Sequence, residues 1–182
     1  MNDMANTALS NYLSSHLCDP SKLKILTIIR GLPGSGKTTA AKDILKMRGQ
    51  VDPLAMYAAD DFFYKDKNYK FDPKKLSEAH KWCQSRTVEA MKQDTGNIVV
   101  HNTFTVHKEM RFYLDKAIEH NYCIEVFNLY DAGLTDEELF ERNVHSVPLE
   151  TIKRMRRRYE KTGEYQFYSP WEYKAKESEN EQ

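Results

Sequence analysis

Apolar residues are distributed along the chain in two alternating patterns. Short, nearly continuous apolar runs, typical of strands buried in a parallel sheet, span residues 24–30, 54–57, 98–100 and 123–129. Segments with helical apolar spacing or helix-capping signals span residues 37–48, 72–92 and 107–120 and begin again at 135 and 148. Strands that alternate with helices predict an α/β fold of three layers, with a mostly parallel sheet between helices on both faces.

The same pattern divides the chain into three parts. Residues 1–22 are polar with scattered Leu and Tyr, and they predict an appended N-terminal arm. Residues 23–162 carry the predicted strands and helices and form one domain of ordinary size. Residues 163–182 are expected to form a polar C-terminal tail, whose aromatic side chains dock on the domain.

Composition narrows the function classes. The 182 residues have a formal net charge of zero, so nucleic acid or membrane binding would need a local basic surface rather than a global one. The three cysteines lack CxxC spacing, which predicts neither a disulfide framework nor a zinc site. No signal peptide pattern and no apolar run long enough to span a bilayer is present, so we expect a cytoplasmic protein.

A glycine-rich motif follows the first predicted strand. Residues 31–38 read Gly-Leu-Pro-Gly-Ser-Gly-Lys-Thr and fit the phosphate-binding P-loop, in which backbone N–H groups surround phosphate oxygens. Lys37 would reach the terminal phosphates, and the Thr38 hydroxyl would ligate Mg²⁺. The motif therefore predicts binding of ATP with Mg²⁺. The residues expected to contact the nucleotide are Gly31, Pro33, Gly34, Ser35, Gly36, Lys37, Thr38 and Thr39.

Polar residues follow the second and third predicted strands, whose carboxyl ends meet the P-loop at one edge of the sheet. Asp60 is the predicted general base for an acceptor hydroxyl, and its neighbour Asp61 points to the opposite side. The alternative is that the pair caps the following loop. Asn102 cannot supply a metal-binding charge, but it can orient Asp60 or the acceptor; alternatively it is a turn residue.

Two helices near the C-terminus predict a lid over about residues 135–160. A capping box that starts at Thr135 opens the first helix. Arg142 and His145 are three residues apart, so we expect them side by side on one face of that helix, in contact with the nucleotide. Arg142 can act on the transferring phosphate as an arginine finger supplied in cis. The alternative is a solvated arginine paired with Glu138.

Two segments provide local positive charge. Residues 62–71 combine aromatic rings with lysines, which suits a nucleic-acid acceptor whose bases stack and whose phosphates meet lysine. The alternative is that Phe62 and Phe63 are core anchors. The basic run 153–158 is expected to be mostly solvated helix surface, with one or two arginines near nucleotide or acceptor.

The run from Ile25 to about Glu160 resembles the small P-loop domains of the Nedd-binding-protein type, which are related more distantly to polynucleotide kinase and the zeta-toxin kinases. The matching segments are Gly31–Thr39, Asp60–Phe63, Phe71–Pro73, Glu78–His80, Asn102–Thr103, Arg142–His145 and the arginine-rich helix to Tyr159–Glu160. The resemblance implies that Asp60 is the general base and that Arg142 contacts phosphate.

The chain departs from polynucleotide kinases on the acceptor side. Phe63 stands where those enzymes carry an arginine for the acceptor phosphate, and Asn102-Thr103-Phe104 stands where they carry Asp-Thr-Asn. The expected acceptor site is formed by Asp61, Phe62, Phe63, Asn102 and Thr103.

These features together predict an ATP-dependent kinase that transfers the γ-phosphate to a hydroxyl of a nucleic acid. The acceptor would be a 5′-hydroxyl end or a hydroxymethylated base in DNA, which would be read as an extruded base. The alternatives are a kinase for a small molecule, nucleoside or nucleotide sugar, and a non-catalytic ATP-binding module.

Overall fold

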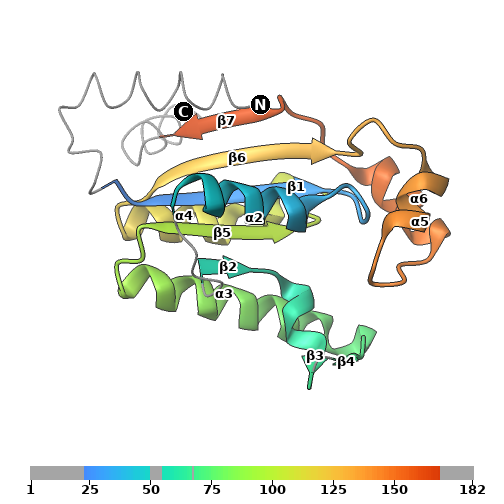
Figure 1. The fold of residues 1–182 in the computed structure, drawn as a ribbon, viewed down its shortest axis with the longest axis horizontal. Helices are drawn as coiled ribbons and strands as arrows, with labels where there is room; N and C mark the ends of the chain where they lie inside the picture. The colour runs from blue at the N-terminus through green and yellow to red at the C-terminus, as the bar shows by residue number, and fades with distance from the viewer. Residues whose placement is uncertain (1–22, 50–54, 67, 169–182) are drawn as a thin grey trace, which may run out of the picture.

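The computed structural model describes residues 23–49, 55–66 and 68–168. Its main sheet has the strand order β2-β5-β1-β6-β7 (Figure 1). The strands are β1 (Ile25–Gly31), β2 (Met56–Tyr57), β5 (Asn97–Asn102), β6 (Cys123–Tyr130) and β7 (Tyr165–Tyr168). All neighbours pair in parallel except β7, which runs antiparallel to β6. The predicted α/β fold with a mostly parallel sheet is confirmed.

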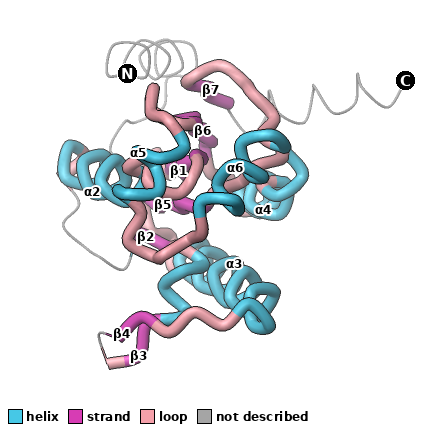
Figure 2. Tube along the Cα trace, turned by 90° about the vertical axis from the view of Figure 1, so that its right-hand side faces the viewer, coloured by secondary structure: helices cyan, strands magenta, loops and turns pink. Residues whose placement is uncertain are grey.

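Helices cover both faces of this sheet (Figure 2). Helix α2 (Lys37–Met47) lies on one face, while α3 (Leu76–Lys92) and α4 (Arg111–Glu119) lie on the other. Because successive strand residues point to opposite faces, Ile28 packs in the core beneath α3 and α4 and Ile29 packs against α2. Both faces of β1 are therefore buried, which explains its continuous apolar sequence.

The aromatic and lysine-rich segment contains more regular structure than the predicted loop. A 3₁₀ helix, η3 (Ala59–Phe63), leads into a short antiparallel hairpin of β3 (Tyr64–Lys65) and β4 (Asn68–Tyr69). A second 3₁₀ turn, η4 (Pro73–Lys75), is capped by Asp72 and precedes α3, and a third, η5 (His107–Glu109), precedes α4. Figure 1 shows the hairpin at the end of the molecule towards which the parallel strands run.

Helices α5 (Asp136–Arg142) and α6 (Leu149–Arg158) lie beyond the carboxyl ends of β1 and β6, as the predicted lid requires (Figures 1 and 2). Their apolar residues pack together and against the P-loop residue Leu32, with Leu139 and Ile152 fully buried. The predicted capping box at Thr135 is present. One prediction about the lid is wrong: α5 ends at Arg142 because Asn143 is extended, so His145 lies in the turn between the helices.

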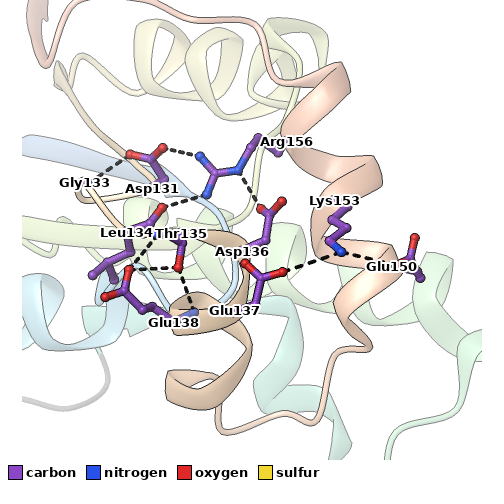
Figure 3. A network of polar contacts seen from close by, with 10 residues as sticks. All are labelled: Asp131, Gly133, Leu134, Thr135, Asp136, Glu137, Glu138, Glu150, Lys153 and Arg156. Carbon is purple, nitrogen blue, oxygen red and sulfur yellow. Dashed lines mark hydrogen bonds and ion pairs between the residues drawn. The ribbon is translucent and has the colours of Figure 1, made fainter.

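Polar contacts connect the two lid helices (Figure 3). The Arg156 guanidinium pairs with Asp131 and with Asp136, 2.6 Å away, and donates a hydrogen bond to the Leu134 carbonyl at 2.8 Å. Lys153 lies between Glu137 and Glu150. Part of the basic run that was expected to be solvated surface therefore holds α6 to α5 and to the end of β6.

A buried arginine fixes the base of the lid. Arg30, at the end of β1, is fully buried; its Nε donates to the Phe104 carbonyl at 3.0 Å and one terminal nitrogen donates to the Thr105 carbonyl at 3.3 Å. Its guanidinium lies 4.4 Å from the ring centroid of Tyr159, the residue that follows α6, and contacts Thr162. The lid thus leaves the domain from an anchored point next to the P-loop.

Some predictions fall outside the described residues, namely the 1–22 arm, the first residue of the strand at 54–57 and the tail beyond 168. Residues 165–168, which the sequence assigned to the tail, form the edge strand β7, and Tyr165 packs on Phe127 of β6. Within the described part, no helix combines the length and hydrophobicity needed to cross a membrane.

Candidate active site

The P-loop connects β1 to α2, and two of its glycines have backbone conformations that side chains disfavour. Gly34 has φ +81°, and a Cβ there would overlap the backbone carbonyl of Leu139 in α5. Gly36 has φ +90°, and a Cβ there would meet open space. The loop is therefore packed tightly against the lid on one side and is open where α2 begins, which is the side from which phosphate can approach the helix N-terminus.

The side chain of Lys37 contacts the backbone of this loop, because its Nζ donates a hydrogen bond to the Leu32 carbonyl at 2.9 Å. Burial lowers the pKa of Lys37 to about 8, and the negative charge of Asp60 acts in the opposite direction. The Ser35 hydroxyl is buried and has no hydrogen-bond partner among the described residues. A partly desolvated cation and an unsatisfied donor at the start of a helix fit a polyphosphate ligand.

The residues also fit a bound magnesium ion, within limits. Thr38 and Thr39 are exposed in the first turn of α2, which allows the Thr38 hydroxyl to serve as a metal ligand. In the described part of the chain, no cluster of three or more His, Cys, Asp or Glu residues can hold a metal by itself. Mg²⁺ would therefore depend on Thr38 together with phosphate oxygens.

Asp60 and Asp61 lie in η3 and have different surroundings. Asp61 accepts a hydrogen bond from the Ala58 backbone N–H at 2.9 Å, and burial raises the pKa of its carboxyl group. It therefore has the capping role that was the alternative for the pair. Asp60 instead has a side chain that is 44 % exposed, and it lies near enough to Lys37 to affect that group's pKa. Asp60 is thus the carboxylate that faces the P-loop.

Asn102 holds the backbone that carries Asp60. Its Oδ1 accepts a hydrogen bond from the Ala59 N–H at 2.8 Å, and its Nδ2 contacts the Cys83 Sγ at 3.8 Å. Both ends of this buried amide are engaged within the protein, so Asn102 fixes η3 instead of facing a metal ion. Thr103 meets the P-loop through its backbone, because its carbonyl accepts from the Gly31 N–H at 3.2 Å.

The structure favours the alternative for the two phenylalanines. Phe63 is only 4 % exposed and makes edge-to-face contacts with Phe62, Tyr69 and Phe71. Phe62 packs against Trp82 of α3. Both rings anchor η3 and the hairpin to the core, so the prediction that Phe63 lines an acceptor site is wrong.

Arg142 is exposed at the C-terminal end of α5. The pKa of Glu138 lies below its usual value, first because Thr135 donates hydrogen bonds to it and also because of the positive charge of Arg142. This arrangement matches the alternative of a solvated arginine near Glu138.

His145 lies near Asp60 and the hairpin. Its Nε2 is 3.8 Å from the Asp60 Oδ2, and its ring centroid is 4.7 Å from that of Tyr69. Tyr69 donates a hydrogen bond to the Asp60 Oδ1 at 3.2 Å. The pKa of Tyr69 is raised, first by burial and also by the negative charge of Asp60 and by this hydrogen bond. Sequence reasoning missed Tyr69 because the hairpin that brings it back to Asp60 was expected to be an irregular loop.

Comparison with known proteins identifies the family of the domain. Residues 26–162 match the sequence profile of a family described as AAA domain. The chain belongs to this family of P-loop kinase-like domains. It is also 35% identical over 140 residues to the human NEDD4-binding protein 2, a match that covers 75% of this chain and 8% of that protein. The match thus spans only a small part of this relative.

Solved structures share the fold. A chain of the Pnkp1/Rnl/Hen1 RNA repair complex superposes with a TM-score of 0.56 at 19% identity, over 75% of this chain and 44% of the other. A gluconokinase from Sinorhizobium meliloti 1021 gives a TM-score of 0.50 at 13% identity, over 76% of this chain and 77% of the other. The two superpositions show a common fold, and at identities this low the substrate has to be argued from the site.

Proposed function

We propose that this protein is an ATP- and magnesium-dependent kinase that phosphorylates a hydroxyl group of a nucleic acid. The observation that carries the proposal is the position of Asp60, an accessible carboxylate opposite Lys37 at the carboxyl edge of the sheet. Phosphoryl transfer is catalysed mainly by positioning and electrostatic stabilisation, and these two groups would act on the two reacting partners.

In the proposed reaction, the acceptor hydroxyl lies against Asp60, which takes its proton as the oxygen attacks the γ-phosphorus. The new O–P bond forms while the bond between the γ-phosphorus and its bridging oxygen breaks, and ADP leaves. Lys37 and the P-loop N–H groups stabilise the charge on the phosphate oxygens. Magnesium, held by Thr38 and the phosphates, would neutralise further negative charge there.

A nucleic acid is the favoured acceptor because of the hairpin beside Asp60. Tyr64 and Phe71 are 46 % and 50 % exposed, and Lys65 and Lys70 are exposed beside them. Exposed rings next to lysines suit unpaired bases and their phosphates.

The test is transfer of labelled γ-phosphate from ATP to a panel of acceptors: 5′-hydroxyl DNA and RNA oligonucleotides, DNA with hydroxymethylated bases, nucleosides and sugars. Labelling of an oligonucleotide that Asp60→Asn loses and that falls steeply with added salt supports the proposal. Labelling of nucleosides or sugars alone would identify a small-molecule kinase. ATP binding that depends on Lys37 with no transfer to any acceptor would identify a non-catalytic module.

A further inference from the structure

The turn between the lid helices has a defined shape. Asn143 donates hydrogen bonds from Nδ2 to the carbonyls of Phe140 and Val147, at 3.0 and 3.3 Å, and its Oδ1 accepts from the Val147 N–H at 2.9 Å. Ser146 adopts a left-handed conformation with φ +54°. Val144 projects outward and is 80 % exposed, whereas the adjacent His145 side chain is only 24 % exposed. The side chain of Asn143 therefore closes a turn that directs His145 inward.

His145 points towards Asp60 and towards the hairpin. The His145 ring lies against Tyr69 and within 6.3 Å of the Tyr64 ring, centroid to centroid. Its Nδ1 is buried with no hydrogen-bond partner among the described residues, so the polar contact of this imidazole is the one made by Nε2 with the Asp60 Oδ2. The Tyr69 hydroxyl occupies the other carboxylate oxygen of Asp60. Two separate elements, the lid turn and the hairpin, thus act on one carboxylate.

We propose that His145 is a positioning residue for Asp60, which ties the orientation of the base to the position of the lid. The inference rests on the proposed role of Asp60 as general base. A carboxylate that is 44 % exposed rotates freely unless it is held, and a general base must stay within hydrogen-bond reach of the proton it takes. The separation of 3.8 Å is longer than a hydrogen bond, so a small movement of the lid towards η3 completes the contact.

The role differs from the nucleotide contact that the sequence predicted for His145. Removing a residue that binds nucleotide lowers the affinity for ATP. Removing a residue that orients the base lowers the rate of transfer and leaves the affinity for ATP intact. His145→Ala should therefore reduce kcat about tenfold, with the ATP dissociation constant changed less than about twofold. His145→Gln keeps an N–H donor and should recover part of the rate, and Val144→Ala serves as the control in the same turn.

A double-mutant cycle separates this role from a general effect on the lid. In the Asp60→Asn background, His145→Ala should cause no further loss of rate, because the group that it positions is gone. Equal losses in both backgrounds, or a loss of ATP affinity in place of rate, would overturn the inference. If Asp60→Asn transfers phosphate at the wild-type rate, Asp60 is not the general base and the proposed function fails. If Asp60→Asn is slow but the His145 variants transfer at the wild-type rate, only the inference about His145 fails.

Hydrogen exchange tests the contact without any activity. Asp60→Asn removes the charge that faces His145, so the amides of residues 143–147 should exchange about two- to fivefold faster than in the wild type. Asp43→Asn, an equal charge change on the exposed face of α2, should leave these amides unaffected. Unchanged exchange in Asp60→Asn would show that the turn is held without Asp60 and would refute the coupling.

Discussion

The lowered pKa of Lys37 leads to a specific prediction for nucleotide binding. The Lys37 ammonium group is partly buried and donates a hydrogen bond to the Leu32 carbonyl, and its pKa is about 8. A bound triphosphate requires the charged form, so protein in which Lys37 is neutral must take up a proton before it binds. Raising the pH above 8 depopulates the charged form, and the affinity for ATP should fall.

The magnitude follows from the pKa. The apparent dissociation constant scales with one plus the ratio of neutral to charged Lys37, so it should rise about tenfold between pH 7 and pH 9, equivalent to roughly 1.4 kcal/mol. The triphosphate does not contribute to this change, because phosphate groups complete their last ionisation near pH 6. His101, the other buried group that senses Lys37, has a pKa of about 4, lowered mainly by burial, and stays neutral throughout.

The assay is a titration of the protein with a fluorescent ATP analogue and Mg²⁺ at half-unit steps from pH 7 to pH 9.5. The control is Lys37→Arg, whose guanidinium stays charged over the whole range, so its affinity should vary little with pH even if it is weaker overall. An affinity for the wild type that is flat from pH 7 to pH 9.5, or a slope that persists in Lys37→Arg, would refute the assignment of this titration to Lys37.

Thermal denaturation and kinetics test the supporting contacts. Gly34→Ala should cost at least about 2 kcal/mol of stability, because it combines a left-handed backbone with overlap on α5, whereas Gly49→Ala, with φ +71° and open space, should cost about 1 kcal/mol. Arg156→Met leaves the carboxylates of Asp131 and Asp136 without their partner and should destabilise the protein by about 1–3 kcal/mol. Arg157→Met, at an exposed position, should destabilise it by less than about 0.5 kcal/mol. Asn102→Leu leaves an N–H of η3 unpaired, so it should slow phosphate transfer with ATP affinity retained; weaker ATP binding instead would contradict its structural role.

Features set by local sequence were predictable. The strand β1 is an apolar run buried on both faces, and the P-loop is determined by glycines and by the lysine that follows them, so both could be located from the chain alone. The capping box at Thr135 likewise involves residues three apart in sequence. In each of these cases the stabilising partners are neighbours along the chain or follow from a simple period.

Features that depend on partners distant in the sequence could not be predicted. Arg156 looked like one member of a charged run, and only the fold brings Asp131 and Asp136 to it. Arg30 lies near the end of an apolar strand, and nothing in the sequence signals that carbonyls from another connection surround it. The end of α5 was misplaced because the Asn143 side chain satisfies backbone groups of the next turn, which competes with continuation of the helix.

The contacts of Asp60 suggest how donor and acceptor requirements are divided in this fold. Its backbone position is fixed by the buried hydrogen bond between the preceding residue and Asn102 on a central strand, and that strand pairs directly with the one that leads into the P-loop. In the proposed mechanism, the distance from this base to the phosphate is therefore set by the rigid sheet. The orientation of its carboxylate instead depends on Tyr69 and His145, which lie on the hairpin and the lid turn. Since connecting segments change shape and sequence at lower cost than a buried sheet, acceptor choice can be altered in these two segments while the donor site is preserved.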